Sequence, residues 1–188
     1  MNWVTSDQHM GHEAIVRYSN RPFMCARDMN EALVSNFNSV VSENDTTYHI
    51  GDFSMREKEV PIYLPRLHGS HILIFGNHDA CHPCKKKWQQ AAERYLDYGF
   101  KELHQELELD EFVLSHMPFY NEAAHDQRHK QYRPVRKSNK VLLHGHVHTS
   151  WRYRANPPQY NVGVDANHYF PISLDGIRAF LASNPEEQ

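Results

Sequence analysis

The sequence has few cysteines, no long hydrophobic run and no excess of basic residues, and each absence excludes a class of protein. Only 3 of the 188 residues are cysteines, an odd number that argues against a disulfide framework. The longest apolar runs, such as HILIF at 71–75, are far shorter than the roughly 20 residues that cross a bilayer. The start, MNWVTSDQ, lacks the basic and apolar stretches of a signal peptide. We therefore expect a cytoplasmic protein without a membrane partner.

The charge balance limits the partners further. The formal net charge is −3, so no overall basic field is present to hold nucleic acid without sequence preference. One stretch, 128–140, is locally basic and carries a tyrosine between its lysines and arginines. Such a stretch can hold a nucleotide or a short oligonucleotide, or it can be a solvated face. Contact with nucleic acid is expected only there.

Two of the cysteines form a CxxC motif, Cys81 and Cys84. A structural zinc site of this type needs a second ligand pair with similar spacing, and the sequence has none. We expect reduced thiols that bind no metal. A labile loop disulfide or an accessory metal site is the alternative.

Length and periodicity indicate one domain, 1–188, of the α/β class. Apolar strand-like runs and helical patterns alternate through the first half, and strand-like runs dominate the second half. This order favours an α/β sandwich with mixed sheets. Asp28 is expected to cap a helix over 28–41, and Ser173 a final helix. Residues 119–140 show no clear period and are expected to form a long loop that faces the substrate.

Residues that can bind metals recur directly after the predicted strands. Because the carboxyl ends of strands in open α/β sheets meet at one edge, these short motifs are expected to converge there. Any one of them alone is more typical of a turn. The residues that follow the five strand-like runs are Asp7, His9, Asp52, Asn77, His116, His146 and His148.

These seven side chains offer oxygen and nitrogen but no sulfur, and they are too many for one tetrahedral zinc ion. Two divalent ions are therefore expected, with four protein ligands each if Asp52 bridges them. The mixed donors suit Mn²⁺ best, with Fe, Zn²⁺ or Ni²⁺ as alternatives. Two such ions, balanced by two aspartates and a bridging hydroxide, leave net positive charge for an incoming anion. Phosphate esters fit that field.

The motifs DxH, GD, GNHD, a later His before Met-Pro, and GHxH, in this order from Asp7 to His148, resemble the calcineurin-like metallophosphoesterases. The segments SDQHMGHEAIVRYSNRPF and NVGVD, at 161–165, resemble the small bacterial and phage-type members in particular. The resemblance implies an αββα sandwich, two mixed β-sheets flanked by helices. One departure is Gln8, a larger residue than usual between the first two ligands, which could change what fits above the first ion.

The resemblance also implies individual roles. Asp7, His9, Asp52 and His148 would bind one ion, and Asp52, Asn77, His116 and His146 the other. His78 would be a catalytic acid or a donor to the transition state, and Asp79 would orient it. The GHxH turn also contains Gly145, which would let the backbone approach the ions. His144 is either a hydrogen-bond partner behind the ligands or simply the last strand residue.

The function expected from these features is a dinuclear metal-dependent phosphoesterase that attacks with a metal-bridging hydroxide. His12, Arg17 and Arg21 follow the first ligands and are candidates for substrate binding, although Arg17 could equally be a solvated helix residue. These arginines and the basic stretch favour phosphodiesters or cyclic nucleotides. Alternatives are a phosphomonoesterase and a catalytically silent, metal-stabilised module that binds a nucleotide or a partner protein.

Overall fold

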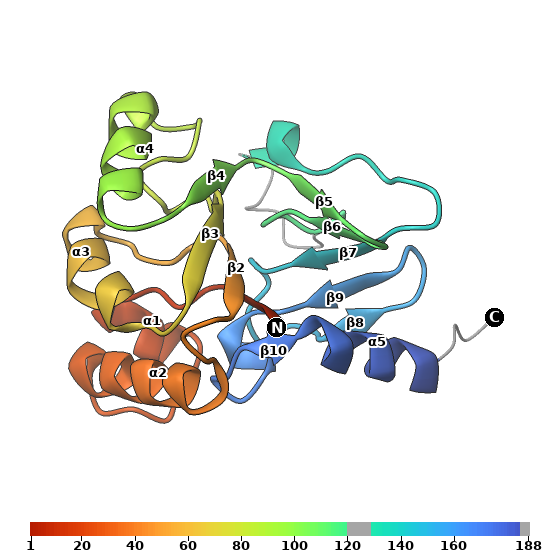
Figure 1. Ribbon diagram of the computed structural model, residues 1–188, viewed down its shortest axis with the longest axis horizontal. Helices are drawn as coiled ribbons and strands as arrows, with labels where there is room; N and C mark the ends of the chain where they lie inside the picture. Colours follow the sequence, from red (N-terminus) through yellow and green to blue (C-terminus); the bar gives the residue numbers. More distant parts are fainter. Residues whose placement is uncertain (120–128, 185–188) are drawn as a thin grey trace.

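The computed structural model describes residues 1–119 and 129–184, and within them two five-stranded mixed sheets (Figure 1). The first sheet has the order β10-β1-β2-β3-β4. Strands β1 to β4 are parallel to one another, and β10 is antiparallel to β1. The strands are β1 (Asn2–Thr5), β2 (Thr46–Ile50), β3 (Ser70–Ile74), β4 (Glu102–His104) and β10 (Ile172–Ser173).

The second sheet has the order β5-β6-β7-β9-β8. Its three central strands are parallel, and both edge strands are antiparallel to their neighbours. The chain passes from the first sheet to the second between β4 and β5, which the sequence shows as one β-like run. The strands are β5 (Leu107–Leu109), β6 (Phe112–Leu114), β7 (Val141–His144), β8 (Tyr153–Arg154) and β9 (Gln159–Asn161).

Helices cover the outer face of the first sheet, and α5 lies beside β8 and β10 (Figure 1). Residues 57–66 form three short helical pieces, η1, α3 and η2, and the last two have a proline in the first turn. The helices are α1 (Glu13–Tyr18), α2 (Ala26–Val40), η1 (Glu57–Glu59), α3 (Val60–Tyr63), η2 (Leu64–Arg66), α4 (Trp88–Asp97), η4 (Val164–Ala166) and α5 (Leu174–Ser183).

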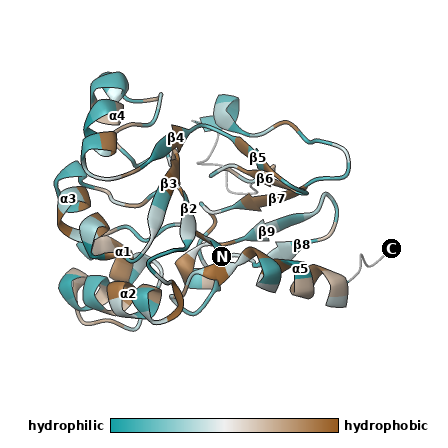
Figure 2. Ribbon diagram, viewed as in Figure 1, coloured by the Kyte–Doolittle hydropathy of each residue, from teal (hydrophilic) through white to brown (hydrophobic). Residues whose placement is uncertain are grey.

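Two hydrophobic cores hold the layers together. Alternate residues of a strand point to opposite faces of its sheet, so β2 places Tyr48 and Ile50 in the core between the sheets and His49 against the helices. Figure 2 shows the same division, with hydrophobic residues in the strands of both sheets and hydrophilic residues on the outer helices. The expected α/β sandwich of two mixed sheets and helices is confirmed.

Two helix starts test the capping predictions. Ser173 caps α5, because its side chain accepts a hydrogen bond of 3.0 Å from the backbone N–H of Gly176. The prediction for Asp28 is wrong: α2 begins at Ala26, its N-cap is Cys25, and Asp28 lies in the first turn. Glu13 accepts from the Ala26 N–H instead, at 2.9 Å. No helix in the described part of the chain is long and apolar enough to span a membrane.

Candidate metal centre

Five of the predicted ligands lie in turns whose backbone is left-handed at the ligand itself. Such φ angles are uncommon for residues other than glycine, and they cluster at functional sites. Each turn follows a strand and directs its side chain toward the edge shared by the two sheets. The angles are 58° at Asp7, 52° at His9, 53° at Asp52, 71° at His146 and 47° at His148.

Two glycines let these turns pack against one another. A Cβ atom on Gly145 would lie 2.0 Å from Ser6 Oγ and 2.3 Å from Asp7 Oδ2, and one on Gly76 would lie 2.0 Å from the Asp52 nitrogen. Any larger residue at either position would push a ligand turn away. Gly145 was expected to let the backbone approach the ions. In the structure it lets the ligand turns approach each other.

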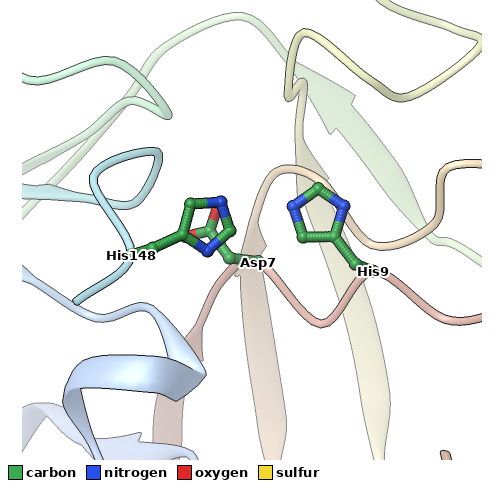
Figure 3. Close-up of side chains that lie close together, drawn as sticks. All are labelled: Asp7, His9 and His148. Carbon is green, nitrogen blue, oxygen red and sulfur yellow. The ribbon is translucent and has the colours of Figure 1, made fainter. Parts of the chain in front are cut away.

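Asp7, His9 and His148 form a first group, in which one donor atom from each lies within 4.8 Å of the others. Figure 3 shows the Asp7 carboxylate beside the His148 ring, with the His9 ring facing both. The rings of His9 and His148 are nearly parallel, 5.2 Å apart. All three side chains come from loops at the carboxyl ends of β1 and β7.

Asp7, Asp52 and His116 form a second group by the same distance. Asp52 Oδ2 lies 3.4 Å from His116 Nε2 and 3.6 Å from His9 Nε2, so one carboxylate oxygen stands between the two groups. The His116 Nδ1 atom donates to the Ile50 carbonyl oxygen at 2.8 Å, which turns Nε2 toward Asp52.

The two remaining predicted ligands lie at the same place. Asn77 is buried directly after β3, beside the second group. The His146 ring is 5.2 Å from the His116 ring, and its backbone N–H donates to both oxygens of Asp7 at 3.1 and 3.0 Å. His146 belongs to neither group, although its turn holds the Asp7 carboxylate in position.

Burial and mutual charge shape the acid–base properties of the centre. Burial alone would raise the pKa of Asp52, but the positive charge of His116, 3.4 Å away, holds it well below its usual value. Burial opposes protonation of His116, yet Asp52 raises the pKa of His116 to about 10. Burial lowers the pKa of His9. A divalent ion would replace these protons as the positive charge beside Asp52.

The donors fit a metal rather than a protein-only hydrogen-bond network. Within the set of predicted ligands, four buried side-chain atoms have no hydrogen-bond partner: both ring nitrogens of His9, the His116 Nε2 atom and Asn77 Oδ1. A buried polar atom without a partner is costly, and a bound cation removes that cost. The oxygen and imidazole donors, without thiolate, suit Mn²⁺, Fe or Zn²⁺.

His78 lies next to both groups but belongs to neither. Its Nε2 atom is 4.0 Å from Asp52 Oδ2, its side chain is 39% exposed, and its backbone N–H donates to Asp52 Oδ1 at 2.8 Å. Burial lowers the pKa of His78. The ring thus lines the cavity next to the predicted ligands. A side chain in this position can reach a molecule bound in the cavity.

Asp79 does not orient His78 as expected. Its Oδ2 atom accepts hydrogen bonds from the backbone N–H groups of Gly76 and Asp52, both at 2.9 Å. Burial and the charge of Asp52 raise the pKa of Asp79 to about 7. Asp79 binds the backbone instead of His78 because the Asp52 and Gly76 turns bury N–H groups that need an acceptor, and the Asp79 carboxylate provides it.

The three residues expected to bind substrate have different places. His12 lines the cavity in front of the centre, with its ring 5.5 Å from that of His9. Arg17 is exposed on α1 and does not line that cavity. The prediction that Arg21 binds substrate is wrong, because its side chain is 0% exposed and binds Asp165. Gln8 also points away from the centre, donating to His49 at 2.8 Å.

Asp165 is the functional residue that the sequence interpretation missed. It is fully buried behind the centre, and Asp165 Oδ2 accepts from His148 Nδ1 at 2.7 Å. Burial favours its neutral form, but His148 and Arg21 lower the pKa of Asp165. The signal was present: Asp165 ends NVGVD, and like the other site residues it follows a buried strand, β9.

His144 and the cysteines have structural places. His144 ends β7, is completely buried, donates from Nδ1 to the Gly145 carbonyl at 2.7 Å and packs on Trp151. It is therefore the last strand residue and steadies the GHxH turn through the backbone. All three cysteines are free, with Cys81 buried and Cys84 exposed.

A cavity of about 850 Å³ opens in front of the centre. Its lining includes predicted ligands and His78, together with residues of α1, Met55 and Lys85. Of the loop expected at 119–140, residues 120–128 lie outside the described residues. His129 reaches the cavity, whereas Lys137 is paired with Glu106 and Glu108, at 2.6 Å each. The basic stretch is thus partly neutralised by the protein itself.

Comparison with known proteins agrees with this geometry. Residues 3–162 match the family described as the calcineurin-like phosphoesterase superfamily domain. The chain is 29% identical over 184 residues to an uncharacterized protein of Methanocaldococcus jannaschii, covering 93% of this chain and 88% of that protein. It is 29% identical to the Gene 66 protein of Mycobacterium phage L5, covering 87% and 86%.

A similar solved structure is that of a protein of unknown function from Aquifex aeolicus. Its TM-score is 0.70 at 26% sequence identity, and the match covers 96% of this chain and 98% of that one. The fold described above therefore recurs over nearly the full length of both chains.

Proposed function

The chain belongs to the calcineurin-like phosphoesterase superfamily, and from that premise we propose that it is a dinuclear metal-dependent hydrolase of phosphate esters. The observation that carries the proposal is the position of Asp52. Its Oδ2 atom lies 3.6 Å from a histidine of the first group and 3.4 Å from a histidine of the second, as a carboxylate that bridges two ions must.

The predicted ligands divide between two metal positions. Asp7, His9 and His148 would hold one ion together with Asp52, and Asp52, Asn77, His116 and His146 would hold the other; the two clusters of ligand atoms and the contact between the His116 and His146 rings support this division. When bound, two divalent ions activate water near neutral pH and offset the charge of the phosphate. The most suitable ion is Mn²⁺, with Fe, Zn²⁺ or Ni²⁺ as alternatives.

The protein's own groups complete the reaction. Hydrolysis leaves negative charge on the departing oxygen, which must be protonated or stabilised. His78 is the described side chain that faces the cavity beside the ligands without belonging to either ligand group, so it is the donor. His12 also lines the cavity, with its ring 5.5 Å from that of His9, and would contact the phosphate.

The cavity favours a substrate larger than a phosphate monoester, such as a phosphodiester or a cyclic nucleotide. Its lining includes Ile15, Tyr18 and Met55, and Tyr18 is 81% exposed. An exposed aromatic ring beside apolar side chains offers a surface on which a base stacks. This replaces the support expected from Arg17 and Arg21, which do not line the cavity.

The test is a substrate panel with matched metal analysis. With Mn²⁺ present, bis-p-nitrophenyl phosphate and 2′,3′-cyclic nucleotides are expected to turn over faster than p-nitrophenyl phosphate. Protein prepared without chelator is expected to contain up to two transition ions per chain. Asp52→Asn should lose both ions and activity together, because a bridging carboxylate serves both positions.

Each alternative has its own outcome. A marked preference for the monoester would identify a phosphomonoesterase. Tight nucleotide or partner binding without turnover, in protein loaded with both ions, would identify a silent binding module. An Asp52→Asn variant that keeps two ions and near-normal turnover would contradict the bridging role. The three free cysteines support a reducing compartment, the cytoplasm, as the place of action.

A further inference from the structure

Arg21 and Asp165 form an ion pair that is completely buried. Arg21 Nε and one terminal nitrogen contact the two oxygens of Asp165 at 2.8 Å each, and both side chains are 0% exposed. Burying two charges is costly, and such a pair contributes little to stability compared with apolar side chains of similar size. Stability alone therefore does not explain the pair, and its other contacts indicate what it does.

Its other contacts lead to the first ligand group. Asp165 accepts from His148, and Arg21 donates to the carbonyl oxygens of Asp7 at 2.7 Å and Gln8 at 2.9 Å. These two carbonyls flank the left-handed turns at Asp7 and His9. Each ligand of the Asp7–His9–His148 group is thus held, through its ring or its neighbouring peptide, by one buried pair.

The second group is held in another way. His116 donates to a backbone carbonyl, that of Ile50, and the Asp52 turn is fixed by Asp79. In the described part of the chain, neither the Arg21 nor the Asp165 side chain forms a hydrogen bond with Asp52, Asn77 or His116. The two groups share Asp7, and the His9 N–H donates to the Asp52 carbonyl at 3.0 Å, but within the centre the side-chain hydrogen bonds of the buried pair reach only the first group's own members: His148 and the Asp7–Gln8 backbone.

We propose that Arg21 and Asp165 are positioning residues that set the affinity of the Asp7–His9–His148 metal position selectively. A carboxylate only accepts hydrogen bonds, so it keeps the proton of His148 on Nδ1 and leaves Nε2 with its lone pair toward the centre. Arg21 balances the charge of Asp165 and holds the Asp7–Gln8–His9 backbone. The inference rests on the proposed function, because it concerns a metal that this function requires.

The experiment compares metal binding by Asp165→Asn and the wild-type protein. Each is titrated with Mn²⁺ in competition with a chelator, and paired ions are followed by electron paramagnetic resonance. The variant is expected to bind one ion with near wild-type affinity and the other roughly 10- to 100-fold more weakly. The coupled-pair signal should then appear only at higher Mn²⁺.

Two further variants separate positioning from general loss of structure. Glu111→Gln weakens an exposed arginine–carboxylate contact, to Arg178, and should leave both affinities unchanged. In a His148→Gln background, Asp165→Asn should weaken the remaining binding by less than about threefold, because its effect acts through His148. Circular dichroism and thermal unfolding show whether each variant is folded.

The outcomes distinguish this inference from the proposed function. Equal weakening of both positions, or none, in a folded Asp165→Asn variant overturns the selective role while the wild-type protein still binds two ions and hydrolyses esters. An undiminished effect of Asp165→Asn in the His148→Gln background overturns it as well. A wild-type protein that takes up no Mn²⁺ overturns the proposed function and this inference together.

Discussion

At the scale of single residues, the centre combines deeply buried predicted ligands with a more exposed histidine that lines the cavity. His9 and His116 are about 2% exposed in their side chains, whereas His78 is 39% exposed. A ligand needs rigidity and exclusion of competing water, but a proton donor must reach the leaving oxygen. Exposure thus distinguishes two roles for one residue type within a single cluster.

His78→Gln should therefore retain its metals and lose activity according to the leaving group. A basic alkoxide is a poor leaving group unless it is protonated, and a general acid raises the rate of such a step by roughly 10²–10⁴-fold. A p-nitrophenolate leaves well without one. We expect a loss of that order on alkyl or ribose esters and a much smaller loss on p-nitrophenyl esters, measured as kcat/KM with each substrate.

The matched control is His104→Gln, which removes a partly exposed histidine whose ring contacts Glu102 on β4 at 2.8 Å and lies outside the cavity lining. It should leave both rates unchanged. Small and equal losses for His78→Gln would mean that this ring merely packs at a strand end. Large, equal losses with missing metal would place His78 among the ligands.

At the scale of elements, the centre depends on turns that follow strands and are tied to one another. Asp79 connects the turns after β2 and β3, because one carboxylate oxygen accepts from Asp52 and Gly76. Hydrogen bonds also run from Asp7 to the Gly51 carbonyl and from Gly145 to the His116 carbonyl. The ligand turns consequently support one another across both sheets.

Asp79→Ala should loosen the contact between the turns after β2 and β3, and should therefore lower stability and metal affinity as well as activity. It leaves two buried N–H groups without their acceptor, each at a cost of roughly 1–3 kcal/mol. We expect a lower free energy of unfolding and reduced metal affinity, with equal activity losses on alkyl and p-nitrophenyl esters. Urea unfolding and metal titration of the same preparation measure both.

Asp79→Asn is the matched comparison, because its amide oxygen can still accept from both turns. It should retain most of the stability that the alanine variant loses. If Asp79→Asn instead reproduced the leaving-group selectivity of His78→Gln, Asp79 would act on the histidine ring in solution, as the family resemblance implied, and not on the turns.

At the scale of the whole molecule, the two sheets meet so that their strand ends face one cavity. The first sheet contributes the turns after β1, β2 and β3, and the second contributes those after β6 and β7. Packing between the sheets, through residues such as Ile50, Leu114 and Leu143, sets the distance between them. A metal bound at the joint edge therefore links both halves of the fold.

Metal binding should then stabilise the folded state as a whole. At a free Mn²⁺ concentration about 100 times the dissociation constant, mass action adds about 2.7 kcal/mol for one site. For a chain of this size, this corresponds to a rise of roughly 5–10 °C in Tm. Thermal unfolding with Mn²⁺ and after chelation measures the shift.

Asp52→Asn provides the control for that measurement, since it removes charge shared by both positions. Its Tm should respond to Mn²⁺ by less than half the wild-type shift. A wild-type Tm that does not change between chelator and Mn²⁺ would contradict the expectation that the ions join the two sheets. The expectation that residues 1–188 form one domain stays a prediction.

What the sequence by itself determined was the set of residues and their approximate place. Asp7, Asp52 and Asn77 follow apolar runs directly, and the ends of parallel strands share an edge for purely local and topological reasons. Strand β2, TTYHI at 46–50, is local in the same way, because its β-branched and aromatic residues favour a strand within five residues. Such patterns need no knowledge of distant partners.

Only the tertiary structure decided what the charged side chains around the ligands contact. Arg21 lies 144 residues from Asp165 in the sequence, and nothing near either residue indicates the other. Arg21 was expected at the substrate and Asp79 at His78, but each binds the nearest buried group that needs its charge or its lone pairs. Burial creates that need, and burial depends on how the two sheets and the helices pack.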